Sequence, residues 1–207
     1  MFFAEQWWKV PVLGRRTTVS VSGGACVLFA LMLLVLPLQW LLAAVLAALF
    51  HESCHALAVL LFGGRIRSLH ITAGGAKMVA AQVAAGGEWI CALAGPVGGL
   101  SLLLFARWIP RVALCAAMQS LWNLLPIDPL DGGRVLRCWT ERMLPANRAD
   151  GLCKSVAAFC SALLVGLGIY GSLFLHLGLL PLLPGVFSLL GTKSGKTPCK
   201  QGPKQVQ

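Results

Sequence analysis

The sequence predicts an all-α membrane protein with about six transmembrane helices and a small membrane-surface β-hairpin between the second and third of them. Composition is the first reason. Of the 207 residues, 57% are hydrophobic and only 12% are charged, whereas soluble domains carry about 25% charged residues. The second reason is that the apolar residues gather in long runs with the Lys and Arg residues between them. This pattern excludes a water-soluble globule. The interspersion of the basic residues with long apolar runs, and the lack of a basic arm suited to DNA, favour a lipid bilayer over nucleic acid as the partner.

Six apolar runs are the candidate spans. A helix needs about 20 residues to cross the hydrocarbon core, and the fourth and sixth runs are shorter and interrupted by proline, which is typical of broken spans. The runs are Val19–Leu36, Leu38–Phe62, Trp89–Trp108, Val112–Ile127, Ser155–Leu175 and Leu177–Gly191. The chain therefore divides into an amino-terminal cytoplasmic segment (1–18), a six-span domain (19–191, with its core at 38–136) and a disordered basic tail (192–207).

The basic residues orient these spans, because cytoplasmic loops are enriched in Lys and Arg. With the amino terminus inside, only Arg107 and Arg111 of the 17 Lys and Arg residues fall outside. We therefore expect both termini in the cytoplasm, together with a basic, helical loop at 131–154.

The connection between the second and third runs predicts the hairpin. Residues 65–71 show an imperfect alternation of polar and apolar side chains, followed by a Gly74-Gly75 turn signal and a second apolar stretch from Ala76. Alternation on both sides of a glycine turn is typical of two antiparallel strands. We expect a hairpin over 65–83 at the inner membrane surface.

Three ionisable residues interrupt the second apolar run, in the segment HESCH at 51–55. Helical residues four positions apart project from one face, so His51 and His55 can bind the same ion, and Glu52 lies about 100° around the helix. In this HExxH pattern two imidazoles bind zinc and the glutamate acts on water. The alternative is that neighbouring helices merely satisfy these polar groups, but a charge at the centre of a span costs at least about 2.5 kcal/mol and is usually functional.

A third zinc ligand is needed, because catalytic zinc usually has three protein ligands and an open position for water. The candidates are Asp128 and Asp131 in the segment NLLPIDPLDGG at 123–133. Both lie at the inner end of the fourth run, so the residues alone leave the choice open. Cys54 is a weaker candidate, because a bond from it would distort the helix. We expect the two glycines after Asp131 to free the backbone there.

The segments HESCH and NLLPIDPLDGG together resemble the site-2 protease family of intramembrane zinc metalloproteases. The closest likeness is to the six-span type that includes the stage IV sporulation protease. A small-residue segment, ALAGP at 92–96, is similar to a further motif of that family, and the resemblance covers about 38–136. The resemblance implies one zinc ion per chain held by His51, His55 and Asp131, with Glu52 as the catalytic acid/base and Asn123 as a substrate or oxyanion contact.

The function implied by this resemblance is regulated intramembrane proteolysis in a bacterial cell membrane, with the active site near the cytoplasmic side. The substrate would be a membrane-tethered protein such as a sigma-factor precursor, or a remnant signal peptide, and regulatory membrane proteins are candidate partners. We expect the hairpin to hold an extended substrate segment by strand addition. Cys54 departs from the family, which commonly has glycine there. The alternative functions are a metal-ion transporter, since ionisable residues in broken helices also form ion pathways, and a catalytically silent scaffold.

Overall fold

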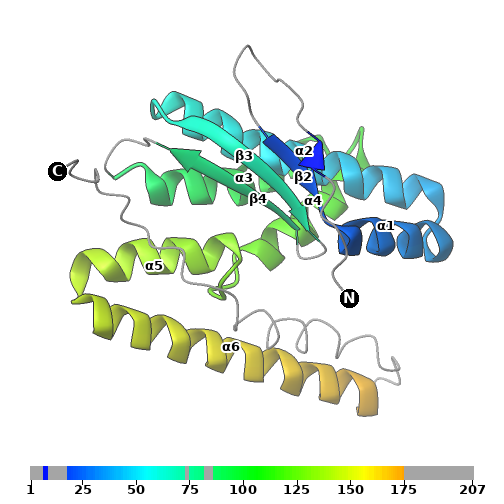
Figure 1. Cartoon of the computed structure of the whole chain (residues 1–207). Helices are drawn as coiled ribbons and strands as arrows, with labels where there is room; N and C mark the ends of the chain where they lie inside the picture. Colours follow the sequence, from blue (N-terminus) through cyan, green and yellow to red (C-terminus); the bar gives the residue numbers. More distant parts are fainter. Residues whose placement is uncertain (1–6, 9–17, 73–74, 82–85, 175–207) are drawn as a thin grey trace. The chain divides into compact units, whose positions relative to one another are not determined.

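The computed structural model describes residues 7–8, 18–72, 75–81 and 86–174 (Figure 1). The chain forms two compact units. The first consists of Met1–Gly87 and Val97–Ser120, and the second of Glu88–Pro96 and Leu121–Gln207. Helices α3 (Glu88–Ser101) and α4 (Pro110–Asn123) each contribute residues to both units.

Three helices in the described part of the chain are long and apolar enough to cross a membrane: Leu38–Leu61, Glu88–Phe105 and Asn147–Ser172. A shorter apolar helix covers Gly23–Val35. Many large apolar side chains on these helices are exposed, as expected where lipid rather than protein covers them. The all-α membrane class is therefore confirmed. The sixth predicted run, 177–191, and the tail lie outside the described residues.

The first unit contains a four-stranded sheet in the order β1-β2-β3-β4 (Figure 1). The predicted hairpin is confirmed as β3 (Arg65–Thr72) and β4 (Gly75–Ala81), which pair antiparallel. On its other side β3 pairs in parallel with β2 (Thr18–Val21), which in turn pairs antiparallel with β1 (Trp7–Trp8).

Strand β2 corrects the predicted start of the first apolar run, which was placed at Val19. The β-branched residues at 18, 19 and 21 favour extended backbone, and α1 (Gly23–Val35) begins only after Ser22. The Ser22 hydroxyl accepts a hydrogen bond from the backbone N–H of Ala25 at 3.3 Å, which caps the helix.

Helix α2 (Leu38–Leu61) follows Pro37 and ends at two glycines. The backbone N–H of Gly63 donates to the carbonyl of Leu60, and that of Gly64 donates to the carbonyl of Val59 at 2.8 Å. This pattern is a Schellman motif, and the φ of 71° at Gly63 is the left-handed conformation that the motif requires. The helix that carries HESCH therefore has defined ends and returns the chain to β3.

One face of α2 is buried and carries two alanines followed by the two histidines. Ala43, Ala47, His51 and His55 recur at every fourth position and are all buried. Ala47 packs in a core cluster with Leu102 of the 3-10 helix η1 (Leu102–Phe105) and Ala116 of α4. The two histidines therefore continue the stripe along which α2 packs on its neighbours.

The second unit is built around α5 (Asp131–Met143) and α6 (Ala146–Phe174), which contact each other. The expected basic helical loop at 131–154 is thus α5 and the start of α6. Thr140 of α5 is buried, and its hydroxyl lies 3.3 Å from the Cys153 sulfur of α6. Helix α4 ends at Asn123, so residues 124–127 of the fourth predicted run are not helical.

Candidate metal and catalytic site

His51 and His55 form a buried pair on α2, with exposed fractions of 1% and 7%. Their Nε2 atoms lie 3.2 Å apart, and their rings meet edge to face with an interplanar angle of 81°. The four-residue spacing thus brings the two imidazoles together as the sequence predicts. Two buried nitrogens aimed at each other can share one proton or one cation.

Glu52 lies on the same helix and is half-buried. The next residue, Ser53, is exposed, and its hydroxyl donates to the Leu49 carbonyl at 2.7 Å, which is the local bond that helical serines commonly make. Glu52 therefore stands between the buried His51 face and the exposed face of α2.

Cys54 packs against α3. A Cβ atom added at Gly98 would collide with the Cys54 sulfur and would lie 2.9 Å from the Cys54 Cβ. Distances under 3.0 Å are essentially never seen for real Cβ atoms, so α3 can approach Cys54 this closely only because residue 98 is glycine. This contact explains Cys54 as a residue that packs α2 against α3. The glycines that follow ALAGP in the sequence are the feature that could have predicted such a close helix contact.

The adjacent Gly99 plays the same part toward α4. A Cβ atom added there would collide with the hydroxyl oxygen of Ser120 and would lie 3.3 Å from the Ala116 carbonyl. Ser120 is fully buried. Small residues at helix contacts let backbones approach closely in membranes, so this pair of glycines sets the spacing of α3 from its neighbours in the first unit.

The segment 124–130 folds back onto the first turn of α5. A Cβ atom at Gly132 would collide with the Leu124 carbonyl oxygen, and one at Gly133 would lie 2.6 Å from the Ile127 carbonyl oxygen. Both glycines are buried and helical. The expectation that they free the backbone is therefore wrong, because their lack of a side chain instead makes room for the loop.

The two candidate carboxylates lie in different surroundings in the second unit. Asp131 is the first residue of α5 and is buried, with an exposed fraction of 8%. Its carboxylate pairs with Arg134 at 3.7 Å, and the Arg134 side chain is 47% exposed. Asp128 lies in the loop, and its carboxylate accepts from Arg137 at 3.4 Å. In the sequence Arg137 is one of many basic residues assigned to the cytoplasmic side, and nothing in the pattern around it predicts this contact.

Asp131 lies at the amino-terminal end of α5. The positive end of the α5 dipole lies at its amino terminus, where a negative charge is stabilised. Asn123 is the last residue of α4, eight positions before Asp131. Asn123, Asp128 and Asp131 belong to the second unit, while His51, Glu52 and His55 belong to the first.

The chain is similar to known proteins in its fold and in one sequence segment. Among solved structures, the chain is similar to the site-2 protease from Methanocaldococcus jannaschii, with a TM-score of 0.64 and 15% sequence identity over 93% of this chain and 98% of that chain. At this identity the likeness shows a shared fold. Residues 24–125 match the family described as peptidase M50B-like. The segment 24–125 therefore matches the peptidase M50B-like family, and the whole chain has the fold of a site-2 protease. No curated protein matches it.

The match to the M50B-like family supports a metalloprotease, and the long apolar helices support a membrane protein. The match to the M50B-like family includes the HESCH segment and Asn123 and ends before Asp128 and Asp131. His51, His55 and Asp131 are all buried, and their side chains are of the kinds that could hold a metal ion.

Proposed function

We propose that this protein is a member of the site-2 protease family and a zinc endopeptidase that cleaves a peptide bond in or near the transmembrane segment of a membrane-tethered protein. The observation that carries the proposal is the buried pair of imidazole nitrogens on an apolar helix long enough to cross a membrane. A chain that only needed a packed helix would have no reason to bury two histidines in the stripe occupied by Ala43 and Ala47.

The spacing of the pair fits zinc. Zinc binds histidine nitrogens at about 2.0–2.1 Å in tetrahedral geometry, which requires two such nitrogens to lie roughly 3.3–3.4 Å apart. The Nε2 atoms of His51 and His55 lie 3.2 Å apart. Two imidazoles therefore need almost no rearrangement to share the ion.

We assign the third ligand to Asp131 rather than Asp128. Asp131 is buried and begins a helix, so its charge is stabilised and its backbone is held. Asp128 faces Arg137, whose side chain is only 13% exposed. Moving Asp128 to a metal would leave this arginine with one fewer acceptor in a poorly hydrated place, which is costly.

Glu52 is the proposed acid/base. When bound, zinc would supply Lewis-acid activation of a water molecule and of the scissile carbonyl. Glu52 would accept the proton from the attacking water and deliver it to the nitrogen of the departing peptide. It can do so because it neighbours His51 while being less buried than the histidine ring. Asn123 would donate its side-chain amide to the oxygen on which negative charge develops.

The sheet of the first unit supports a mode of substrate binding. Among the described strands, β4 pairs only with β3, so it has an edge that an extended peptide could join. Helix α2, which carries the histidine pair, contacts β3. A substrate helix must unwind before its peptide bond can be attacked, and the edge of β4 would hold the unwound segment. We propose a membrane-tethered regulatory protein, such as a sigma-factor precursor, as the substrate class and the cytoplasmic half of a bacterial membrane as the place of cleavage.

The test is Glu52→Gln in proteoliposomes with a candidate single-span substrate, with zinc measured on the same preparation. Glutamine keeps the shape of the side chain but cannot accept the proton, so zinc content should stay at one per chain while cleavage falls by about 10²–10⁴-fold. A transporter or a scaffold has no use for this proton transfer. Cleavage at the wild-type rate by zinc-loaded Glu52→Gln protein would refute the mechanism.

A further inference from the structure

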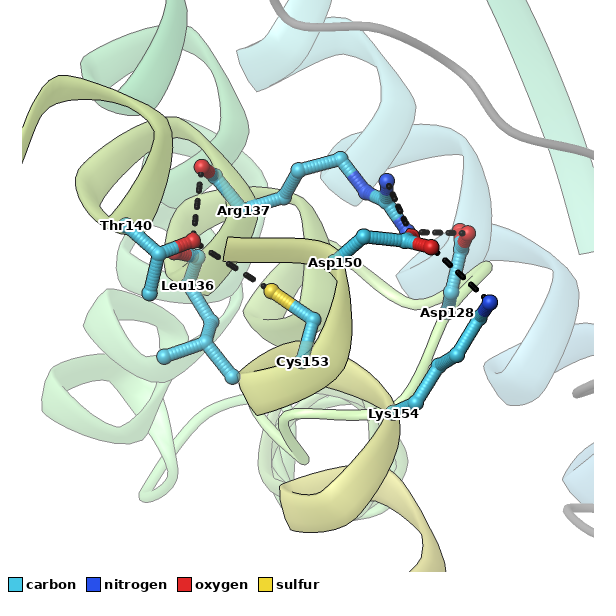
Figure 2. Close-up of polar contacts among 7 residues, drawn as sticks. All are labelled: Asp128, Leu136, Arg137, Thr140, Asp150, Cys153 and Lys154. Carbon is cyan, nitrogen blue, oxygen red and sulfur yellow. Dashed lines mark hydrogen bonds and ion pairs between the residues drawn. The ribbon is translucent and has the colours of Figure 1, made fainter. Parts of the chain in front are cut away.

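Arg137 lies between two carboxylates in the second unit (Figure 2). One terminal nitrogen of its guanidinium lies 3.4 Å from Asp128 of the loop, and the other lies 3.5 Å from Asp150 of α6. The second oxygen of Asp150 pairs with Lys154 at 2.8 Å. Two cations thus balance two anions, and the arginine at the centre is 13% exposed whereas Lys154 is 70% exposed.

The forked shape of the guanidinium suits this position. A planar group with separate terminal nitrogens can engage two carboxylates at once, which a lysine ammonium does less well. Since Arg137 projects from α5, it joins three elements: the loop through Asp128, its own helix, and α6 through Asp150. Pairs in poorly hydrated surroundings are also less screened than exposed pairs.

Through its pair with Asp128, Arg137 holds the loop 124–130, which leads into Asp131. Asp128 lies three residues before Asp131, and buried Ile127 accepts a hydrogen bond from the backbone N–H of Leu130 at 2.8 Å. The same loop is seated on the two glycines of α5. Its position is therefore set by close backbone packing on one side and by the Arg137 ion pair on the other.

We propose that Arg137 is a positioning residue for the metal site, acting through Asp128 to hold the loop that presents Asp131. This inference rests on the proposed function, in which Asp131 is a zinc ligand. Outer partners that orient metal ligands typically change metal affinity by about 10–100-fold when they are mutated. Arg137 would also keep the Asp128 carboxylate engaged, so that one aspartate rather than two is available to the metal.

The experiment measures the zinc dissociation constant of the full-length protein in detergent by competition with a chelator, alongside thermal unfolding of the metal-free form. Arg137→Gln should weaken zinc binding by about 10-fold or more. Lys154→Gln is the matched control, because it removes the exposed partner of Asp150 and leaves the loop contact intact; its zinc affinity should stay within about twofold of wild type.

A double-mutant cycle separates positioning from a general loss of structure. Asp128→Asn should weaken zinc binding about as much as Arg137→Gln, and the double variant should be no weaker than either, because both changes break the same contact. Arg137→Lys keeps the charge without the fork and should fall between wild type and Arg137→Gln, which keeps the test usable if the glutamine variant folds poorly.

Three outcomes would overturn the proposal. Arg137→Gln could match Lys154→Gln in zinc affinity, or the effects of Arg137→Gln and Asp128→Asn could add fully. Either result, with normal zinc in the wild-type protein, rejects the positioning role and leaves the proposed protease function standing. Absence of zinc binding by the wild-type protein would instead reject both.

Discussion

The contact between Cys54 and Gly98 allows a quantitative test of how α2 is held against α3. Replacing Gly98 by alanine adds one methyl group, which would collide with the Cys54 sulfur and lie 2.9 Å from its Cβ. The sulfur could rotate away, but the Cβ is fixed to the backbone of α2. One of the two helices must therefore shift, and α2 carries His51 and His55.

The expected free-energy change combines two terms. Overpacking a tight contact costs about 1–3 kcal/mol, while alanine in place of glycine in a helix gains about 1 kcal/mol. Because the obstacle includes a Cβ atom, we take the upper part of the first range and expect Gly98→Ala to lower the free energy of unfolding by about 1–2 kcal/mol. A Cβ atom added at Gly166 of α6 would meet nothing within 4 Å, so Gly166→Ala should instead stabilise the protein by up to about 1 kcal/mol.

The assay is equilibrium unfolding in detergent micelles titrated with SDS, on both alanine variants and on each in a Cys54→Gly background. Cys54→Gly removes both obstructing atoms, so in that background Gly98→Ala should behave like Gly166→Ala. The coupling between positions 54 and 98 should then be about 2–3 kcal/mol, at the upper end of measured couplings between residues in contact. A destabilisation that persisted after Cys54→Gly, or a Gly98→Ala protein as stable as Gly166→Ala, would refute the reasoning.

Two further predictions concern the third ligand and the orientation in the membrane. Asp131→Ala should lose zinc and cleavage together, whereas Asp128→Ala should keep zinc, with its affinity lowered no further than in Arg137→Gln; zinc content that followed Asp128 instead would show that the ligand is misassigned. In a cysteine-free background on intact cells, an impermeant maleimide should label a cysteine at Gln39 and not one at Arg148, both of which are exposed; the reverse labelling would invert the topology.

The histidine pair could be predicted from the local sequence. The α-helix repeat places residues four apart on one face, so the spacing in HESCH was enough to predict that His51 and His55 would meet. The β3–β4 hairpin was predictable for the same reason, because its strands are neighbours in sequence joined by a glycine turn. Membrane character followed from composition alone, since a bilayer span is a local property of about 20 residues.

Contacts between segments distant in sequence could not be predicted in this way. Strand β2 pairs with β3 although two helices separate them in the sequence, and no pattern in residues 18–21 predicts which strand they will pair with. The close contact of Gly98 with Cys54, and the pairing of Arg137 with both Asp128 and Asp150, likewise could not be read from the sequence. Periodicity reports which face of an element is apolar or reactive, but which partner meets that face depends on how the elements pack, and packing is a property of the whole chain.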